Sequence, residues 1–283
     1  MAICGKYFEY NGKSSEELGL AIGFLNMKDE IPMGLARTVE RGEVNQYRYR
    51  ANHFGTTYDD VLVFELGLVK DNCDPDVDDI RFSRSEVREI NAWLTSPKLP
   101  KLFHMTDYDD DDIDLELYDE YVDYFCTMTN VTASGNDEVT VLTYEVTCDS
   151  PFGYSQEIKR NIHATYAIPG TATIINNSDE LEDYIYPTMK IIPQSTGEII
   201  IENITDGRSM TIDVLASDII YMDCQKLTIY DETKNLITFD DLGITDVDDI
   251  YWFRLCSGKN NIKITGNVDV EIKYREPRKV GAY

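Results

Sequence analysis

The sequence predicts a mainly β protein of two domains that contains one α-helix. Three observations lead to this prediction. Residues 83–97 carry an apolar stripe at helical spacing, residues 139–148 alternate between two faces, and residues 155–283 hold many short strand-like runs with no helical period. At 283 residues, 42% of them hydrophobic, the chain is long enough to bury two ordinary cores.

The helix is expected near residues 84–95. Ser83 and Glu86 have the spacing of a capping box, in which each side chain accepts a hydrogen bond from the other residue's backbone amide. Pro97 cannot continue a helix, so the element ends before it. The residues of the apolar stripe are Val87, Ile90, Trp93 and Leu94. A lone helix of this length is marginal in water, so we expect it to lie on a sheet.

The rest of the first domain, residues 1–154, should consist of strands and turns. Asn11-Gly12 indicates a hairpin, and residues 37–49 alternate loosely around Gly42 in the most basic part of the chain. Residues 61–68, VLVFELGL, indicate a buried strand. Further strands are expected at 98–105, 121–129 and 139–148, where Leu142, Tyr144, Val146 and Cys148 share one face. Loops are expected at 71–79 and after residue 107.

The second domain, residues 155–283, should follow a junction at 149–154, where Pro151 and Gly153 end the preceding strand. Asp206-Gly207 indicates a tight turn within it. Its expected strands are 171–175, 188–192, 198–204, 210–214, 219–222, 226–230, 252–255, 261–265 and 268–274. Short strands at regular spacing are typical of a β-sandwich or jelly roll.

Composition excludes several functional classes. With 52 acidic and 26 basic residues the net charge is −26, so the chain should repel nucleic acid rather than bind it nonspecifically. Its apolar segments are too short to span a membrane, and the N-terminus lacks the pattern of a secretory signal. The cysteines lack metal-binding spacing and are expected to be reduced, mostly in cores. They are Cys4, Cys73, Cys126, Cys148, Cys224 and Cys256.

No catalytic, cofactor-binding or metal-binding residue is predicted. Asp107, Asp109 and Asp111 stand at calcium-loop spacing, but Asp112 replaces the required Gly and Tyr118 the required Glu. We therefore expect a solvated loop there, and the same for the acidic residues between Asp74 and Asp79. The three histidines, His53, His104 and His163, are each isolated in the sequence. The sequence lacks the phosphate-binding, dinucleotide-binding and nucleophile-elbow motifs.

Four segments, in this order and spacing, resemble the distal tail proteins (Dit) of long-tailed bacteriophages, a phage tail component family. They contain a basic segment running into a strand, a helix ending in Trp-Leu, a domain junction and an alternating C-terminal segment. The matching residues are Arg41-Gly42 with Asn45, Tyr47, Gly55, Tyr58, Asp60 and 61–68; Arg88–Thr95; Cys148–Tyr154; and Leu255, Gly258, Asn260-Asn261, Ile262, Ile264, Gly266 and Tyr274–Arg278.

The resemblance implies a non-enzymatic structural protein of the virion tail tip, made in the bacterial host cytoplasm. It implies an N-terminal β-sandwich or split barrel with one helix that assembles into a ring, usually a hexamer. It also implies a C-terminal galectin-like or jelly-roll sandwich. The implied partners are the tail tube protein, the tail-associated tip protein and, further out, receptor-binding proteins or host glycans. DNA would pass through the ring without specific binding, and an acidic lining would suit that passage.

Two other functions remain open from the sequence. The second domain could be a carbohydrate-binding module that stacks sugars on Trp252 or exposed Tyr residues, although a Trp in a strand is more often part of a core. A glycan-cleaving enzyme would need two carboxyl groups facing each other across a cleft, and a sequence with 52 acidic residues does not reveal such a pair.

Overall fold

The computed structural model describes residues 5–25, 37–42, 53–58, 60–71, 79–107, 122–135, 138–216 and 218–279. The chain divides into two compact units. Unit 1 comprises Met1–Ser155 with Arg278–Tyr283, and unit 2 comprises Gln156–Pro277. The chain is therefore mainly β, as predicted, and each unit has its own hydrophobic core.

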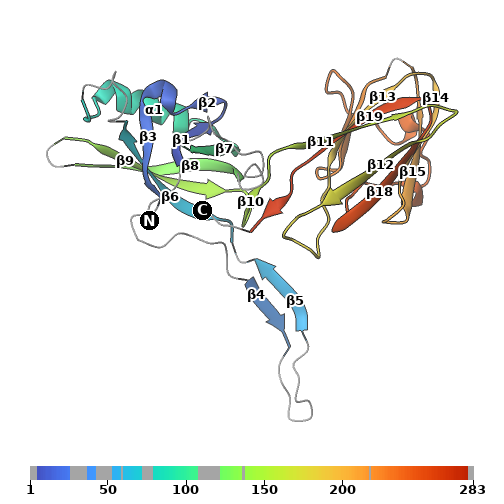
Figure 1. Ribbon diagram of the computed structural model, residues 1–283, viewed down its shortest axis with the longest axis horizontal. Helices are drawn as coiled ribbons and strands as arrows, with labels where there is room; N and C mark the ends of the chain where they lie inside the picture. The colour runs from blue at the N-terminus through green and yellow to red at the C-terminus, as the bar shows by residue number, and fades with distance from the viewer. Residues whose placement is uncertain are drawn as a thin grey trace, which may run out of the picture. The chain divides into compact units, whose positions relative to one another are not determined.

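Unit 1 contains one antiparallel sheet whose strands follow the order β2-β1-β7-β8-β9-β6-β3 (Figure 1). The short strand β10 pairs with β8 and with β20. Strands β1 and β3 contact each other although they lie near opposite ends of this order, so the sheet curves toward closure. The strands are β1 (Gly5–Tyr10), β2 (Lys13–Ser14), β3 (Leu20–Leu25), β6 (Val63–Lys70), β7 (Lys101–Asp107), β8 (Asp123–Ser134), β9 (Val141–Cys148), β10 (Gly153–Tyr154) and β20 (Pro277–Arg278).

The only α-helix among the described residues, α1 (Arg84–Thr95), lies on this sheet and contacts β8. Both bonds of the predicted capping box are present: Glu86 N donates to Ser83 Oγ at 3.3 Å, and Ser83 N donates to Glu86 Oε2 at 2.6 Å. Ile90 and Leu94 are buried in the core, whereas Trp93 is only partly buried. The sequence pattern thus correctly predicted both the helix and the face it buries.

Replacing Ser83 with Ala should lower the free energy of unfolding of unit 1 by about 1 kcal/mol, because the Glu86 amide loses its acceptor. Urea denaturation of the full chain measures this change. Ser96→Ala, at the other end of the helix where the residue is exposed, is the matched control and should have little effect. Equal stability of the Ser83 variant and the wild type would contradict a stabilising role for the cap.

Other predicted elements of unit 1 are confirmed in detail. Asn11 and Gly12 have positive φ values of 53° and 75° and join β1 to β2, as the Asn-Gly signal requires. Along β9 the side chains of one face are buried, as the alternation predicts. The segment predicted as a buried strand, β6, is buried only in part, because Val63 and Glu65 are exposed.

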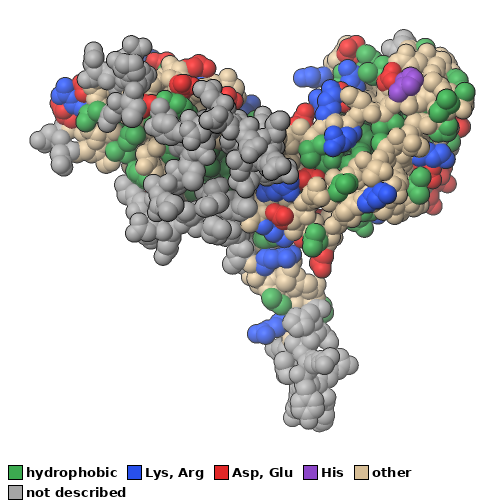
Figure 2. Space-filling model, viewed as in Figure 1, with side chains coloured by type: hydrophobic (Ala, Val, Ile, Leu, Met, Phe, Trp, Pro, Cys, Tyr) green, Lys and Arg blue, Asp and Glu red, His purple; other side chains and the backbone are tan. Residues whose placement is uncertain are grey.

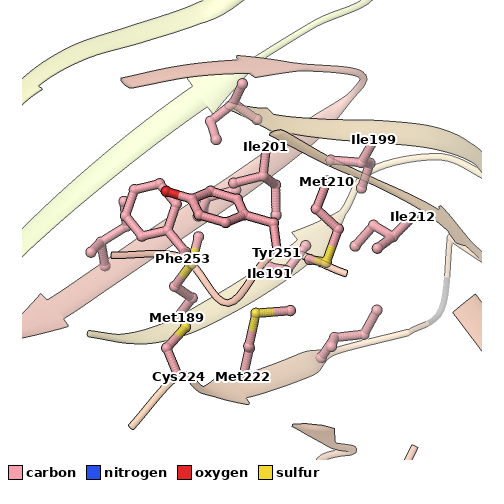
Figure 3. Packing of buried hydrophobic residues seen from close by; sticks show 14 of the residues in the cluster. Met189, Ile191, Ile199, Ile201, Met210, Ile212, Met222, Cys224, Tyr251 and Phe253 are labelled. Carbon is pink, nitrogen blue, oxygen red and sulfur yellow. The ribbon is translucent and has the colours of Figure 1, made fainter. Parts of the chain in front are cut away.

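Unit 2 is a sandwich of two antiparallel sheets, with strand orders β11-β19-β13-β16-β17 and β12-β18-β14-β15. Its core lies between the sheets, and Figure 3 shows apolar side chains of both sheets meeting there around Tyr251 and Phe253. Alternate residues of β19 are buried, which is the pattern of a strand with one face on a core. The strands are β11 (Ile158–Ala164), β12 (Gly170–Asn176), β13 (Thr188–Pro193), β14 (Gly197–Asn203), β15 (Arg208–Val214), β16 (Ile220–Asp223), β17 (Thr228–Tyr230), β18 (Gly258–Thr265) and β19 (Val268–Tyr274).

One strand prediction for unit 2 is wrong, and one observed strand was not predicted. Residues 252–255 were expected to form a strand, but only Leu255 is bridged, to Ile185. Burial alternates along this segment as in a strand, since Phe253 and Leu255 are buried between partly exposed neighbours. The alternating sequence pattern therefore reflects contact with the core, although the segment does not pair with a neighbouring strand along its length. Strand β11 was not predicted, because only Ile162 and Ala164 of its residues are buried.

Candidate interaction surface: the hairpin β4–β5

Strands β4 (Arg37–Arg41) and β5 (His53–Tyr58) form an antiparallel hairpin in unit 1. Among the described strands these two pair only with each other (Figure 1). All five residues of β4 are exposed. Val39 is 48% exposed and Phe54 is 69% exposed. The hairpin therefore presents exposed apolar side chains.

The base of the hairpin is tied to the rest of unit 1 by aromatic contacts. The Arg37 guanidinium lies 4.9 Å from the centre of the Tyr58 ring, and Tyr58 packs edge-on against Phe152 at 5.7 Å. Phe152 in turn contacts Tyr154 at 6.3 Å, and Tyr154 contacts Phe125 at 5.9 Å. Because Phe125 belongs to β8, this chain of rings links the start of β4 and the end of β5 to the sheet.

The hairpin also differs from the rest of the chain in charge. Residues 37–58 contain four Arg (37, 41, 48 and 50) and two Glu (40 and 43), a balance of +2 in a chain of net charge −26. Figure 2 shows Lys and Arg side chains on the described part of the hairpin. A two-stranded hairpin is marginally stable in water by itself. A ribbon with positive charge and exposed apolar side chains is therefore suited to packing against an acidic protein surface.

The acidic segments singled out in the sequence lie mostly outside the described residues. This holds for Asp109, Asp111, Asp112 and Tyr118, and for Asp74, Asp76 and Asp78. Asp107 ends β7, and Asp79 accepts hydrogen bonds from Arg81 at 2.8–3.0 Å, which hold the pKa of the Asp79 carboxyl below its usual range. Within the described part of the chain, no three His, Cys, Asp or Glu side chains gather as a metal site would require.

Two of the three histidines, which are isolated in the sequence, have carboxylate partners in the structure. His104 Nδ1 lies 2.7 Å from Asp123, whose side chain is buried, and His163 Nδ1 lies 2.6 Å from Asp269. Each pair consists of directly opposed residues on neighbouring strands, a relation that sequence spacing does not reveal. His53 belongs to β5, and its side chain lies outside the described part.

The described cysteines behave as core residues. Cys126, Cys148 and Cys224 are buried free thiols, and Cys256 is partly buried. Burial raises the pKa of Cys148 and of Cys224 to about 12, which keeps these thiols protonated and unreactive near neutral pH. Cys4 and Cys73 lie outside the described residues.

In unit 2 the structure brings together a polar network that the sequence did not indicate. The Asp206 carboxylate accepts hydrogen bonds from Arg254 Nε at 2.9 Å, Arg254 Nη2 at 3.0 Å and the Tyr251 hydroxyl at 3.0 Å. The Arg254 bonds are the main cause that lowers the pKa of Asp206.

Trp252, the residue considered above for sugar stacking, packs edge-on against Phe239, with the ring centres 5.7 Å apart, beside the core.

Among the described residues no helix is long and apolar enough to cross a membrane.

Comparisons with known proteins agree with this two-unit architecture. The family profile "Phage tail protein N-terminal domain" matches residues 3–150, and "Phage tail C-terminal domain" matches residues 152–274. No curated protein matches the sequence. Among solved structures, the chain is similar to the Dit (gp 19.1) protein of phage SPP1, described as a paradigm of the hub adsorption apparatus in phages that infect Gram-positive bacteria. The similarity has a TM-score of 0.61 at 11% identity and covers 95% of this chain and 98% of that one. The chain therefore belongs to the phage tail protein family and has the fold of a distal tail protein.

Proposed function

We propose that this protein forms a homo-oligomeric ring at the tip of a phage tail. The ring, a hexamer by the resemblance to distal tail proteins, joins the tail tube protein to the tip and host-recognition proteins. Residues 1–154 build the ring and residues 155–283 decorate it. The protein has a structural role in the virion and carries out no catalysis. The observation that supports this proposal best is the shared fold with SPP1 Dit over nearly the whole length of both chains.

The hairpin β4–β5 is the proposed contact between neighbouring copies. A neighbouring copy has the same net charge of −26, so it offers the acidic surface that the positively charged hairpin needs. It also covers the exposed Val39 and Phe54 side chains. Because Arg37 and Arg41 would then lie between subunits, they would not line the central channel, where positive charge would retain DNA.

Light scattering coupled to size-exclusion chromatography, together with negative-stain micrographs, tests the ring. The expected result is a mass several times 32.4 kDa and particles with a central hole. A monomer at all concentrations would contradict the proposal.

DNA should show no specific binding to these rings. A channel lined by the hairpin arginines would contradict the proposed passage of DNA.

Changing the exposed hairpin residues should dissociate the ring without unfolding the subunit. Phe54→Ser combined with Arg41→Glu should lower the apparent association constant by about tenfold or more, because apolar contact and charge attraction are lost together. The matched control is Leu99→Ser combined with Arg84→Glu, since Leu99 is 71% exposed, close to the 69% of Phe54. Equal dissociation in both double variants would show that the hairpin has no special part in assembly.

A further inference from the structure

Two cysteines lie directly opposite each other in the sheet of unit 1. Cys126 of β8 is paired with Cys148 of β9 in the register of these antiparallel strands. Both side chains point into the same core, since Cys126 is fully buried and Cys148 is only 4% exposed. Both are free thiols in the structure. The two strands are neighbours in the middle of the sheet, so a bond between them would act at the centre of unit 1 (Figure 1).

The backbone hydrogen bonds show which kind of strand pair the two cysteines form. The Cys148 amide donates at 2.9 Å to the carbonyl of Leu62, the residue before β6, and so points away from β8. The next pair along the strands is hydrogen-bonded, because the Asp149 amide donates to the Phe125 carbonyl at 2.8 Å. Cys126 and Cys148 are therefore a non-hydrogen-bonded pair, the type in which opposed side chains lie closer together. The Cα atoms of such a pair are typically about 4.5 Å apart, within the range of roughly 4.4–6.8 Å found in disulfides.

The surroundings of the two thiols determine when they can react. The thiolate is the form that attacks a disulfide, and burial raises the pKa of the Cys148 thiol to about 12. Burial is also the main cause that raises the pKa of Cys126, and the adjacent Cys148 raises it further. Both thiols are therefore protected while the strands are closed. They become reactive while the chain folds, or when β8 and β9 open locally.

We propose that Cys126 and Cys148 form a disulfide when the protein passes from a reducing to an oxidising medium, and that this bond locks β8 to β9. The reaction is thiol–disulfide exchange with a small disulfide such as oxidised glutathione. One cysteine thiolate attacks this oxidant, which gives a mixed disulfide and releases one glutathione. The second cysteine thiolate attacks the cysteine sulfur of the mixed disulfide and releases the other glutathione. The two cysteines are thereby oxidised, and the two glutathione thiolates that leave take up the two protons that the cysteines lost.

The disulfide should stabilise unit 1 against unfolding. It closes the chain segment that runs from β8 to β9, which reduces the conformational freedom of the unfolded chain. The bond needs only two residues of one chain, so its formation does not depend on a ring. Its occasion does rest on the proposed function, because a virion that leaves the host cell moves from a medium that keeps thiols reduced to one in which disulfides persist.

Peptide mapping of the full chain tests the proposal. The reduced protein is unfolded in urea, refolded in a glutathione buffer rich in the oxidised form, and alkylated to block the thiols that remain free. We expect one main cross-linked pair of peptides, which joins Cys126 to Cys148, and alkylation of Cys224 and Cys256. These two belong to unit 2 and lie outside its strands. Urea denaturation should then show that oxidation lowers the unfolding equilibrium constant of unit 1 about a hundredfold.

Cys148→Ala removes one of the two thiols and should abolish both the cross-linked pair of peptides and the gain in stability on oxidation. Cys224→Ala is the matched control, because it removes a buried free thiol of unit 2 and should keep both effects. The proposal is overturned if Cys126 and Cys148 are alkylated after oxidative refolding, if they link to other cysteines, or if their bond leaves stability unchanged. None of these readouts depends on assembly, so failure of this proposal is distinct from failure to form a ring.

Discussion

Replacing Arg254 with Met should lower the free energy of unfolding of unit 2 by about 3 kcal/mol or more. The change removes one partner of a pair whose other member, Asp206, has a side chain only 6% exposed. The Asp206 carboxylate would remain buried and charged but would lose its strongest hydrogen-bond donors. Removing one partner of a buried ion pair is strongly destabilising because it leaves the other charge uncompensated. Urea denaturation of the full chain at about pH 7 measures the loss, followed by the fluorescence of Trp252 in a Trp93→Phe background, because Trp93 lies in unit 1 and also fluoresces.

The same pair predicts how stability depends on pH. Hydrogen bonds from Arg254 are the largest cause that lowers the pKa of Asp206 in the folded state. A lowered folded pKa means that the stabilisation is complete above the unfolded pKa of about 3.9 and is lost as the pH falls through the folded pKa. The wild type and Arg254→Met should therefore differ most near neutral pH and converge in acid.

Arg208→Met is the control for this pair. The Arg208 guanidinium also lies near the network, 5.0 Å from the centre of the Tyr251 ring, but Arg208 is exposed and its hydrogen bond goes to the Ile250 carbonyl instead of Asp206. Its loss should cost well under 1 kcal/mol. A constant difference between Arg254→Met and the wild type from neutral to acid pH would exclude Asp206 as the titrating partner.

The elements that the sequence predicts well are those encoded by local spacing. Ser83 and Glu86 specify the helix start, Asn11-Gly12 specifies a turn, and the alternation along β9 and β19 specifies which face is buried. Each of these signals reflects backbone geometry within a few residues. Nothing in them depends on which distant strand becomes the neighbour.

What the sequence does not predict depends on contacts between distant segments. The Asp206 network joins Asp206 to residues 45 and 48 positions away, and its members are a common Asp, Tyr and Arg with no motif around them. His104 finds Asp123 only through the register of β7 and β8. The sequence does mark the hairpin β4–β5 as unusual, because its excess of Arg stands out in an acidic chain. That the side chains of β4 are exposed becomes visible only in the structure.

Leu94→Ala should destabilise unit 1 by about 3–4 kcal/mol, because Leu94 is fully buried and a cavity would remain under α1. The sequence alone would rank Trp93→Ala higher, at about 3–5 kcal/mol for a fully buried Trp. Trp93 is instead only partly buried: its ring stacks on Phe8 at 5.5 Å and its Nε1 donates to the Tyr10 carbonyl at 3.0 Å. We therefore expect Trp93→Ala to cost about 2–3 kcal/mol.

Urea denaturation of the two variants decides between these rankings. Loss of Leu94 should be at least as costly as loss of Trp93, although the Leu side chain is much smaller. Trp93→Phe separates the contributions further, because it keeps an aromatic ring against Phe8 and removes the donor to Tyr10 together with part of the bulk of the indole. Its expected cost is about 1 kcal/mol. A Trp93→Ala variant clearly less stable than Leu94→Ala would contradict this ranking. It would mean that the helix is held to the sheet mainly through the partly exposed Trp93, and that Ile90 and Leu94 contribute less than their burial implies.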